Sequence, residues 1–220
     1  MSSALLFSSN GKTTMSRLIA TFYNFFMFRT EQHCLRAWRT ALLADVTGDV
    51  LEIGAGTGLS LPCYPGAVRH LTLVEPDPHM RQRLTKTAAL QAIPTDILTM
   101  RGESLVLPSN SFDAVVVSLV LCSVTDPHQV LSDVHRLLKP SGRLYFLEHV
   151  AAEVDSSRLL WQKRFEPFWK RLAGNCHLTR QTEDLITSSG FDIEKIIRQE
   201  MFPAPAFVRP TIRGVAIKRC

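Results

Sequence analysis

Short apolar runs alternate with amphipathic segments along most of the chain. Residues Phe112 to Leu121 read FDAVVVSLVL, a nearly continuous apolar run of the kind that forms strands buried on both faces of a parallel sheet. Shorter runs that each predict a strand occupy residues 49–53, 71–74, 96–100, 143–149, 192–199 and 211–218. This pattern predicts about seven strands in one α/β domain.

The segments between these runs predict helices. One is expected from Met80 to Leu90, and another begins at Asp126, a natural N-cap followed by Pro127 in the first turn, and ends near Leu138. Two more are expected over residues 157–172 and 180–189. Strands that alternate with helices at this spacing form βαβ units, so we predict a doubly wound, mostly parallel sheet.

The N-terminal region has a different character. We expect residues 1–15 to form a flexible tail and residues 16–45 to form lid helices, so that 16–220 is a single domain. The most apolar early stretch, Leu18 to Phe28, has eleven residues, whereas a membrane-spanning helix needs about 20. A second interpretation of this stretch, as an amphipathic element that lies on a membrane surface, is left open. The first residues resemble an organelle transit peptide only loosely.

Composition narrows the class of protein. Hydrophobic residues make up 45% and charged residues 20% of the chain, as in ordinary soluble domains. The net charge of +5 is modest and no run of five basic residues occurs, so nucleic acid is not an expected partner. The five cysteines are widely spaced without a CxxC pair, which argues against a disulfide framework or a structural zinc site and favours free thiols in the cytoplasm.

The sharpest motif is a glycine-rich turn after the first strand. Residues 50–58 read VLEIGAGTG, and glycine permits positive φ and a close approach of ligand to backbone. We expect this turn to open a helix whose amides face the ligand. A dinucleotide-binding loop would need glycine where Leu59 stands. Glu75, at the end of the next strand, suits a ribose diol, and Glu52 suits the cationic end of an amino-acid-like ligand.

These residues and others along the chain resemble the motifs of a known family. EIGAGTG, then VEP, then GES at 102–104 and SFDAVVVSLVLCSV resemble the successive motifs of class I S-adenosylmethionine-dependent methyltransferases. The resemblance implies a Rossmann-like seven-stranded sheet with an antiparallel C-terminal strand. It also implies S-adenosylmethionine as cofactor, S-adenosylhomocysteine as product, and cofactor contacts from Tyr23, Glu52, Gly54, Ala55, Gly56, Gly58, Glu75, Pro76, Gly102, Glu103, Ser104, Ser118 and Leu119.

A narrower resemblance covers about residues 20–220. FYN (22–24), LVLCSV (119–124), FLEHVAAE (146–153), GNCHLTRQT (174–182) and VRPTIRGVAIK (208–218) are similar to segments of the membrane-associated alkyl thiol S-methyltransferases. This implies a small-molecule methyl acceptor, an aliphatic or lipophilic thiol, and peripheral membrane contact by a monomer. The chain departs from that family in having only the short 18–28 stretch where those enzymes carry a longer hydrophobic anchor.

Thiol chemistry makes modest demands on the protein. Methyl transfer from a sulfonium depends mainly on positioning, and a thiol with a pKa near 8.5 is already a few per cent thiolate at neutral pH. No obvious acid–base pair is present, and His149 after the fifth strand is the best candidate for assisting deprotonation. A structural histidine is an equal alternative, and Glu148 is expected to support the site from the other side.

Four residues are candidates for the substrate pocket: Cys122, Trp161, Phe165 and Arg180. For each a plainer interpretation competes. A packed thiol is preferred at Cys122, and the i, i+4, i+7 spacing of 161, 165 and 168 makes core packing the default. Cys176 and His177 are adjacent but lack further ligands at a suitable spacing, so no metal is expected.

Two other functions stay open on the sequence. The same scaffold could methylate an amine or hydroxyl, as in a lipid head group or a quinone. Alternatively, the chain could bind the cofactor without catalysis and act through a partner.

Overall fold

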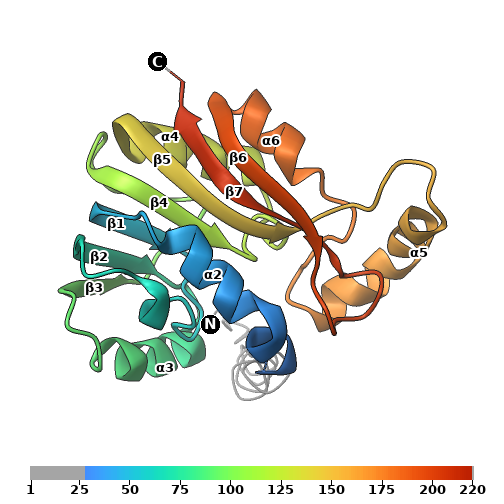
Figure 1. Cartoon of the computed structure of the whole chain (residues 1–220), viewed down its shortest axis with the longest axis horizontal. Coiled ribbons are helices and arrows are strands. Elements are labelled where there is room, and N and C mark those ends of the chain that lie inside the picture. The colour runs from blue at the N-terminus through green and yellow to red at the C-terminus, as the bar shows by residue number, and fades with distance from the viewer. Residues whose placement is uncertain (1–27, 220) are drawn as a thin grey trace, which may run out of the picture.

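Seven strands form one sheet in the order β3-β2-β1-β4-β5-β7-β6 (Figure 1). The computed structural model describes residues 28–219, apart from the side chain of Leu172. The strands are β1 (Gly48–Ile53), β2 (Val68–Val74), β3 (Thr95–Leu98), β4 (Phe112–Ser118), β5 (Leu138–His149), β6 (Phe191–Glu200) and β7 (Pro210–Lys218). Only β7 runs antiparallel to its neighbours β5 and β6 within this sheet, so the predicted fold is confirmed.

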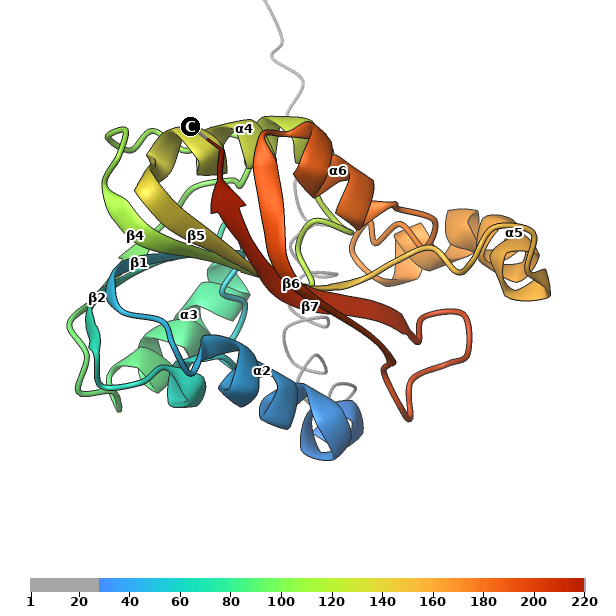
Figure 2. The ribbon, with the colours of Figure 1, turned by 45° about the horizontal axis from the view of Figure 1, so that its top comes forward.

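Helices cover both faces of the sheet (Figure 2). On one face lie α2 (Arg36–Leu43) and α3 (Pro78–Ala88), and on the other lie α4 (Pro127–Leu137) and α6 (Thr182–Ser188). A single π-helical turn, η1 (Glu31–Leu35), leads into α2. The predicted N-cap of α4 is confirmed, because the Asp126 carboxylate accepts the amide N–H of Gln129 at 3.0 Å.

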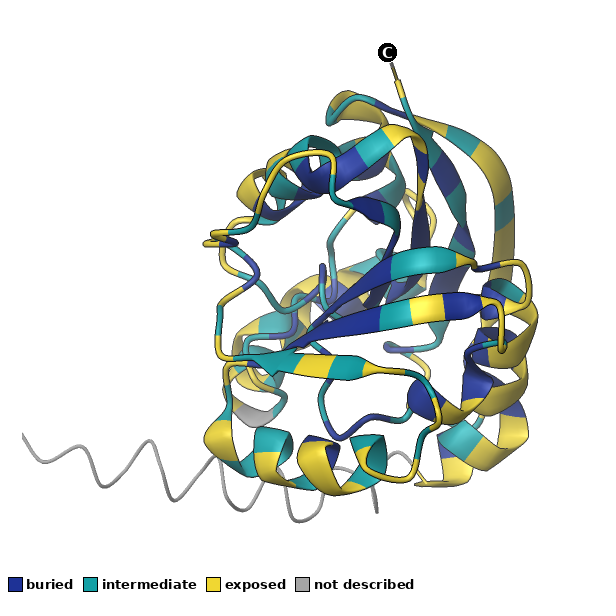
Figure 3. Cartoon of the chain, turned by 90° about the vertical axis from the view of Figure 1, so that its left-hand side faces the viewer, coloured by how far each residue is buried: buried dark blue, intermediate teal, exposed yellow. Residues whose placement is uncertain are grey.

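Alternation along the central strands divides the core into two layers. Leu51 and Ile53 of β1 pack with α4 and α6, whereas Val50 packs with α2 and α3 on the opposite face. Both faces of the central strands are therefore buried, as Figure 3 shows for one side of the molecule. This two-sided burial explains the continuous apolar sequence of β4.

The segment after the glycine turn differs from the expectation. The predicted helix is wrong: the chain makes turns and a short 3-10 helix, η2 (Leu61–Cys63), before it enters β2. Pro62 fits only the first turn of a helix, and Pro65 would remove a donor and clash with the preceding turn. Two prolines so close together end the helix almost where it begins.

Helix α5 (Ser157–Leu172) has the predicted bounds but a different environment. It projects from the body of the molecule (Figure 2), and the predicted core packing is wrong for Trp161 and Phe168, which are 56% and 63% exposed. The buried position is Gln162 instead, which accepts the Ala152 amide at 2.7 Å and donates to the Phe207 carbonyl at 2.9 Å. Because the buried anchor is polar, the apolar spacing of 161, 165 and 168 does not mark the buried side of this helix.

Some predictions lie outside the described residues. They are the tail over residues 1–15 and the first part of the lid helices, which includes Tyr23. Within residues 28–219 no helix combines the length and apolar character needed to cross a bilayer.

Candidate functional site

The glycine turn presents an open face at the carboxyl end of β1. Gly54, Gly56 and Gly58 adopt φ values of 68°, 58° and 86°, which side-chain-bearing residues rarely adopt. A Cβ on Gly54 would lie 2.5 Å from Cγ2 of Val120, so the turn packs closely there. Among the atoms of residues 28–219, a Cβ on Gly56 would have only the Gly54 carbonyl oxygen within 4 Å, at 4.0 Å. The turn is thus closed at Gly54 and has room for a ligand at Gly56.

Glu75, at the end of β2, is joined to that turn by its carboxylate. Oε2 accepts the Gly56 amide N–H at 2.8 Å, and Oε1 accepts the Asp77 amide at 2.8 Å. Each oxygen keeps a second lone pair for a further donor, which fits the hydroxyl pair of a ribose. Burial raises the pKa of Glu75, since a desolvated carboxylate is less stable than the neutral acid.

Glu52 is held on the sheet face that packs against η2. It is buried, its Oε2 accepts the Tyr64 hydroxyl at 2.9 Å, and burial raises its pKa. The placement of Glu52 beside the turn follows the prediction, and its contact with an amino-acid-like ligand stays a prediction.

Sequence reasoning missed Arg39 of α2, which lies next to Ser118 at the end of β4. Its guanidinium is buried, forms an ion pair with the Glu31 carboxylate (Nη1 to Oε2, 2.6 Å), and donates from Nε to Ser118 Oγ at 3.3 Å. Arg39 lies four residues after Leu35 and four before Leu43, both fully packed, so it occupies the buried face of an amphipathic helix. That periodicity is the signal that could have found it.

Four more of the predicted cofactor contacts, Pro76, Gly102, Glu103 and Ser104, lie after β2 and β3. Gly102 is buried, and a Cβ there would lie 3.2 Å from Ile53 Cγ2. The Glu103 carboxylate accepts the Thr125 amide at 2.8 Å, while Pro76 and Ser104 are exposed. Glu103 therefore connects this loop with the one that follows β4.

The end of β4 is conformationally strained. Leu119 has a φ of 59°, uncommon for a side chain of its size and found mostly where surrounding contacts hold it. Those contacts come from Glu148 of β5, fully buried, whose Oε1 accepts the amides of Val120 at 2.9 Å and Leu121 at 3.0 Å, and whose Oε2 accepts that of Cys122 at 3.3 Å. Burial raises the pKa of Glu148.

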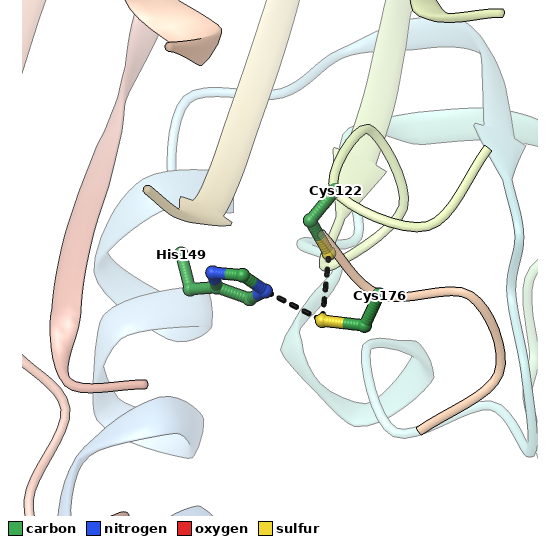
Figure 4. A group of neighbouring side chains, drawn as sticks. All are labelled: Cys122, His149 and Cys176. Atoms are coloured by element: carbon green, nitrogen blue, oxygen red, sulfur yellow. Dashed lines mark hydrogen bonds between the residues drawn. The ribbon is translucent and has the colours of Figure 1, made fainter. Parts of the chain in front are cut away.

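Three side chains converge next to this turn (Figure 4). His149 Nε2 lies 2.6 Å from Cys176 Sγ, which lies 3.8 Å from Cys122 Sγ. The pKa of Cys176 is lowered, because the Cys122 thiol and the His149 ring hydrogen-bond to its sulfur, and the pKa of Cys122 is raised correspondingly. The structure thus brings the predicted residues His149 and Cys122 together, with Cys176 between them.

The neighbour considered for Cys176 in the sequence, His177, is turned elsewhere. Its Nδ1 lies 3.5 Å from the Glu166 carboxylate of α5. Arg180, farther along the same loop, donates from Nη1 to the carbonyls of Leu121 at 2.6 Å and Val124 at 2.9 Å. It fastens the turn after β4, and burial lowers its pKa.

The remaining candidates lie on α5 and beside a surface cleft. Phe165 stacks on Phe207 with ring centroids 5.4 Å apart and lies 5.8 Å from the Trp161 ring. A cleft of about 720 Å³ next to α5 and α6 is lined by Arg180 but, among residues 28–219, by no residue of the glycine turn. It is therefore distinct from the open space at Gly56.

Comparison with known proteins gives concordant results. Residues 51–146 match the family described as Methyltransferase domain. Thiol S-methyltransferase TMT1B of Homo sapiens is 40% identical over 186 residues, which cover 80% of this chain and 74% of that protein.

Two solved structures share the fold. An S-adenosylmethionine-dependent methyltransferase of Thermotoga maritima superposes with a TM-score of 0.67 at 21% identity, over 92% of this chain and 99% of that one. The [4+2]-cyclase SpnF also reaches 0.67, at 17% identity over 84% and 80%. Because one of these two is described as a cyclase, the fold alone does not specify the reaction.

Proposed function

Because this chain belongs to the class I S-adenosylmethionine-dependent methyltransferases, in the family that includes TMT1B, we propose that it methylates an aliphatic or lipophilic thiol. The observation that carries the proposal is the joining of two sites at the carboxyl ends of the strands. The glycine turn with Glu75 lies on one side, and the Cys122, His149 and Cys176 cluster lies on the other. Val120 connects them, since it faces Gly54 and lies two residues before Cys122.

The cofactor is proposed to lie along the glycine turn. The open space at Gly56 suits the methionine part, and the fixed carboxylate of Glu75 suits the ribose hydroxyls. Glu103 and Ser104 are proposed for the adenine end, and Ser118 with Leu119 for the methionine side. Tyr23, one of the predicted cofactor contacts, is proposed to bind the carboxylate of the methionine part.

His149 is proposed to activate the acceptor thiol. Its ring is buried at the carboxyl end of β5, where ligands bind in open α/β sheets. Little further acid–base machinery is needed, because a sulfonium donor is already activated and a thiol ionises close to neutral pH.

Helix α5 supports a peripheral contact with membranes. Trp161 and Phe168 are exposed on it, and so are Lys163 and Arg164 of the same helix. Aromatic rings with basic neighbours are typical of surfaces that lie at a lipid interface. Such a contact would place a lipophilic thiol near the protein, and sedimentation with anionic vesicles tests it through loss of binding in a Trp161→Ala, Phe168→Ala variant.

The deciding experiment is methyl transfer from labelled S-adenosylmethionine to a panel of thiols, amines and phenols, with and without phospholipid vesicles. Gly56→Arg fills the open space at the glycine turn and should abolish transfer. Gly66→Arg is the matched control, since Gly66 lies in an exposed turn where a Cβ would meet no atom of the described part of the chain within 4 Å, and it should retain full activity.

The product pattern distinguishes the functions. Transfer to thiols alone supports the proposal. Transfer to an amine or hydroxyl, above all with a need for vesicles, points to a lipid head group or quinone instead. Cofactor binding without transfer to any acceptor points to a non-catalytic binding protein.

A further inference from the structure

The cluster next to the turn after β4 has the composition of a metal site. Cys122 comes from that turn, His149 is the last residue of β5, and Cys176 lies in the loop between α5 and α6. The two Sγ atoms and a ring nitrogen of His149 all lie within 4.8 Å of one another, and all three residues are buried. Two thiolates and an imidazole are a ligand set that zinc favours.

The distance between the two sulfurs agrees with tetrahedral coordination. With Zn–S bonds of about 2.3 Å, two thiolates of one tetrahedral ion lie about 3.8 Å apart, and the observed separation is 3.8 Å. The corresponding distance from nitrogen to sulfur would be about 3.5 Å, against 2.6 Å between His149 Nε2 and Cys176 Sγ. A shift of the imidazole by about 1 Å would bring this pair to the tetrahedral distance.

The backbone around the cluster is fastened without any metal. The Cys122 carbonyl accepts the His177 amide at 2.7 Å, and the Asn175 side chain donates to the Ser123 carbonyl at 2.8 Å. Glu148 holds the Cys122 amide from behind. The two cysteine-bearing segments are thus linked to each other, and a ligand set held in advance costs less to assemble on binding.

The charges of the surroundings also suit a divalent cation. Two thiolates would balance the charge of a divalent ion, and Arg180 stands near the buried carboxylate of Glu148. While the fourth position is empty the group carries no net charge, which avoids the large cost of isolated charges in the interior.

We propose that Cys122, His149 and Cys176 bind one zinc-like, thiophilic divalent cation whose fourth position receives the acceptor thiol. Three protein ligands with one open position are typical of catalytic rather than structural zinc. This inference rests on the proposed function and specifies how that site activates its substrate. His149 then acts as a ligand, and the metal promotes ionisation of the thiol.

The reaction balances without an oxidant or reductant. The acceptor thiol releases its proton to water as its sulfur bonds to the metal. A sulfur lone pair then forms the new bond to the methyl carbon while the carbon–sulfonium bond breaks, and that electron pair stays on the cofactor sulfur. The product is a neutral thioether, which leaves because thioethers bind zinc more weakly than thiolates do.

Cobalt provides a direct spectroscopic test on the full chain. Metal-free protein titrated with Co²⁺ should bind one equivalent and show thiolate-to-cobalt charge transfer with the visible bands of tetrahedral cobalt. Cys122→Ser and Cys176→Ser should each lose most of the charge-transfer intensity. Cys63→Ser, a buried free thiol outside the cluster, is the matched control and should leave the spectrum unchanged.

The open position is tested without methyl transfer. Hexanethiol added to the cobalt-loaded protein, with no cofactor present, should increase the charge-transfer intensity as a third thiolate binds. Lack of stoichiometric cobalt binding by folded wild-type protein, or an unchanged spectrum in both cysteine variants, overturns the metal site. Cobalt binding without a response to the thiol overturns the open position.

These outcomes are separable from failure of the proposed function, because the spectra do not depend on turnover. Where a serine variant fails to fold, the wild-type spectrum and its response to hexanethiol decide the question. Thiol methylation that persists at the full rate in protein shown to be metal-free would overturn the catalytic part of the inference.

Discussion

Two buried glutamates at strand ends each accept hydrogen bonds from backbone amides, but their surroundings differ. Glu75 lies in the half of the site formed by the glycine turn, and Glu148 lies in the half formed by the turn after β4. Glu75 at the end of β2 accepts amides from the glycine turn and from Asp77, whereas Glu148 near the end of β5 accepts three amides of the turn after β4. Glu75 is 5% exposed and adjoins open space at Gly56, while Glu148 is 0% exposed.

This difference in exposure distinguishes a carboxylate that can bind a ligand from one that only supports the backbone. A carboxylate that faces open space can accept additional donors from a ligand, whereas one enclosed by protein only holds backbone in place. We therefore expect changes at Glu148 to act mainly on the free energy of unfolding, and changes at Glu75 to act mainly on cofactor affinity.

The largest effect is expected for Glu148→Ala. Three backbone donors would lose their acceptor in a buried environment, where each unsatisfied group costs roughly 1–3 kcal/mol. We expect the free energy of unfolding to fall by about 4 kcal/mol, measured by urea denaturation followed by circular dichroism.

Two variants sharpen this result. Glu148→Gln keeps an acceptor for Val120 and Leu121 but turns a donor toward the Cys122 amide, so about half of the loss should remain. Glu153→Ala, at an exposed position, should change the free energy of unfolding by less than about 0.5 kcal/mol. Equal losses at 148 and 153 would contradict the supporting role of Glu148.

The two halves also differ in how much the sequence could predict. Gly56 and Glu75 belong to consecutive strand–turn units, so the parallel sheet places them side by side, and their pairing followed from the motif. The expected fold followed from the same alternation of strands and helices. Here a local pattern determines the local structure.

The cluster of Cys122, His149 and Cys176 depends on distant parts of the chain. Its members are separated by 27 residues at each step, and the contact depends on how the loop after α5 returns to the sheet. In the sequence the histidine next to Cys176 is His177, a pairing discounted for want of further ligands, and adjacent residues in an extended loop face different directions. The burial of Gln162 in place of the aromatic residues of α5 likewise depends on backbone groups of other segments.

The contact between the halves, Gly54 against Val120, gives the second prediction. Gly54→Ala places a Cβ in the left-handed region, at about 1–2 kcal/mol, and against Val120 Cγ2 at 2.5 Å. We expect the free energy of unfolding to fall by about 3 kcal/mol in total, measured by the same denaturation.

Truncation of Val120 to alanine separates the effect of the clash from the effect of the backbone strain. In Gly54→Ala, Val120→Ala the clash is removed while the backbone strain stays, so a double-mutant cycle should show a favourable interaction of about 1–2 kcal/mol. Gly66→Ala, in open space, is the control and should be nearly neutral. Strictly additive effects would mean that the two halves do not contact each other as described.

The smallest of the three effects, and the most selective, is expected for Glu75→Gln. An amide can accept only through its oxygen, so one of the two backbone donors and part of the ribose contact are lost. We expect S-adenosylmethionine to bind about tenfold more weakly, or about 1.4 kcal/mol, by titration calorimetry. The affinity of the control variant Glu153→Gln should be unchanged.

In wild type the ionised carboxylate is the form that accepts ribose hydroxyls, so cofactor affinity is full above the raised pKa of Glu75 and falls as pH decreases through it. The Gln variant cannot ionise and should show a flat profile there, whereas a profile that still falls would assign the titration to another group and remove Glu75 from the ribose contact.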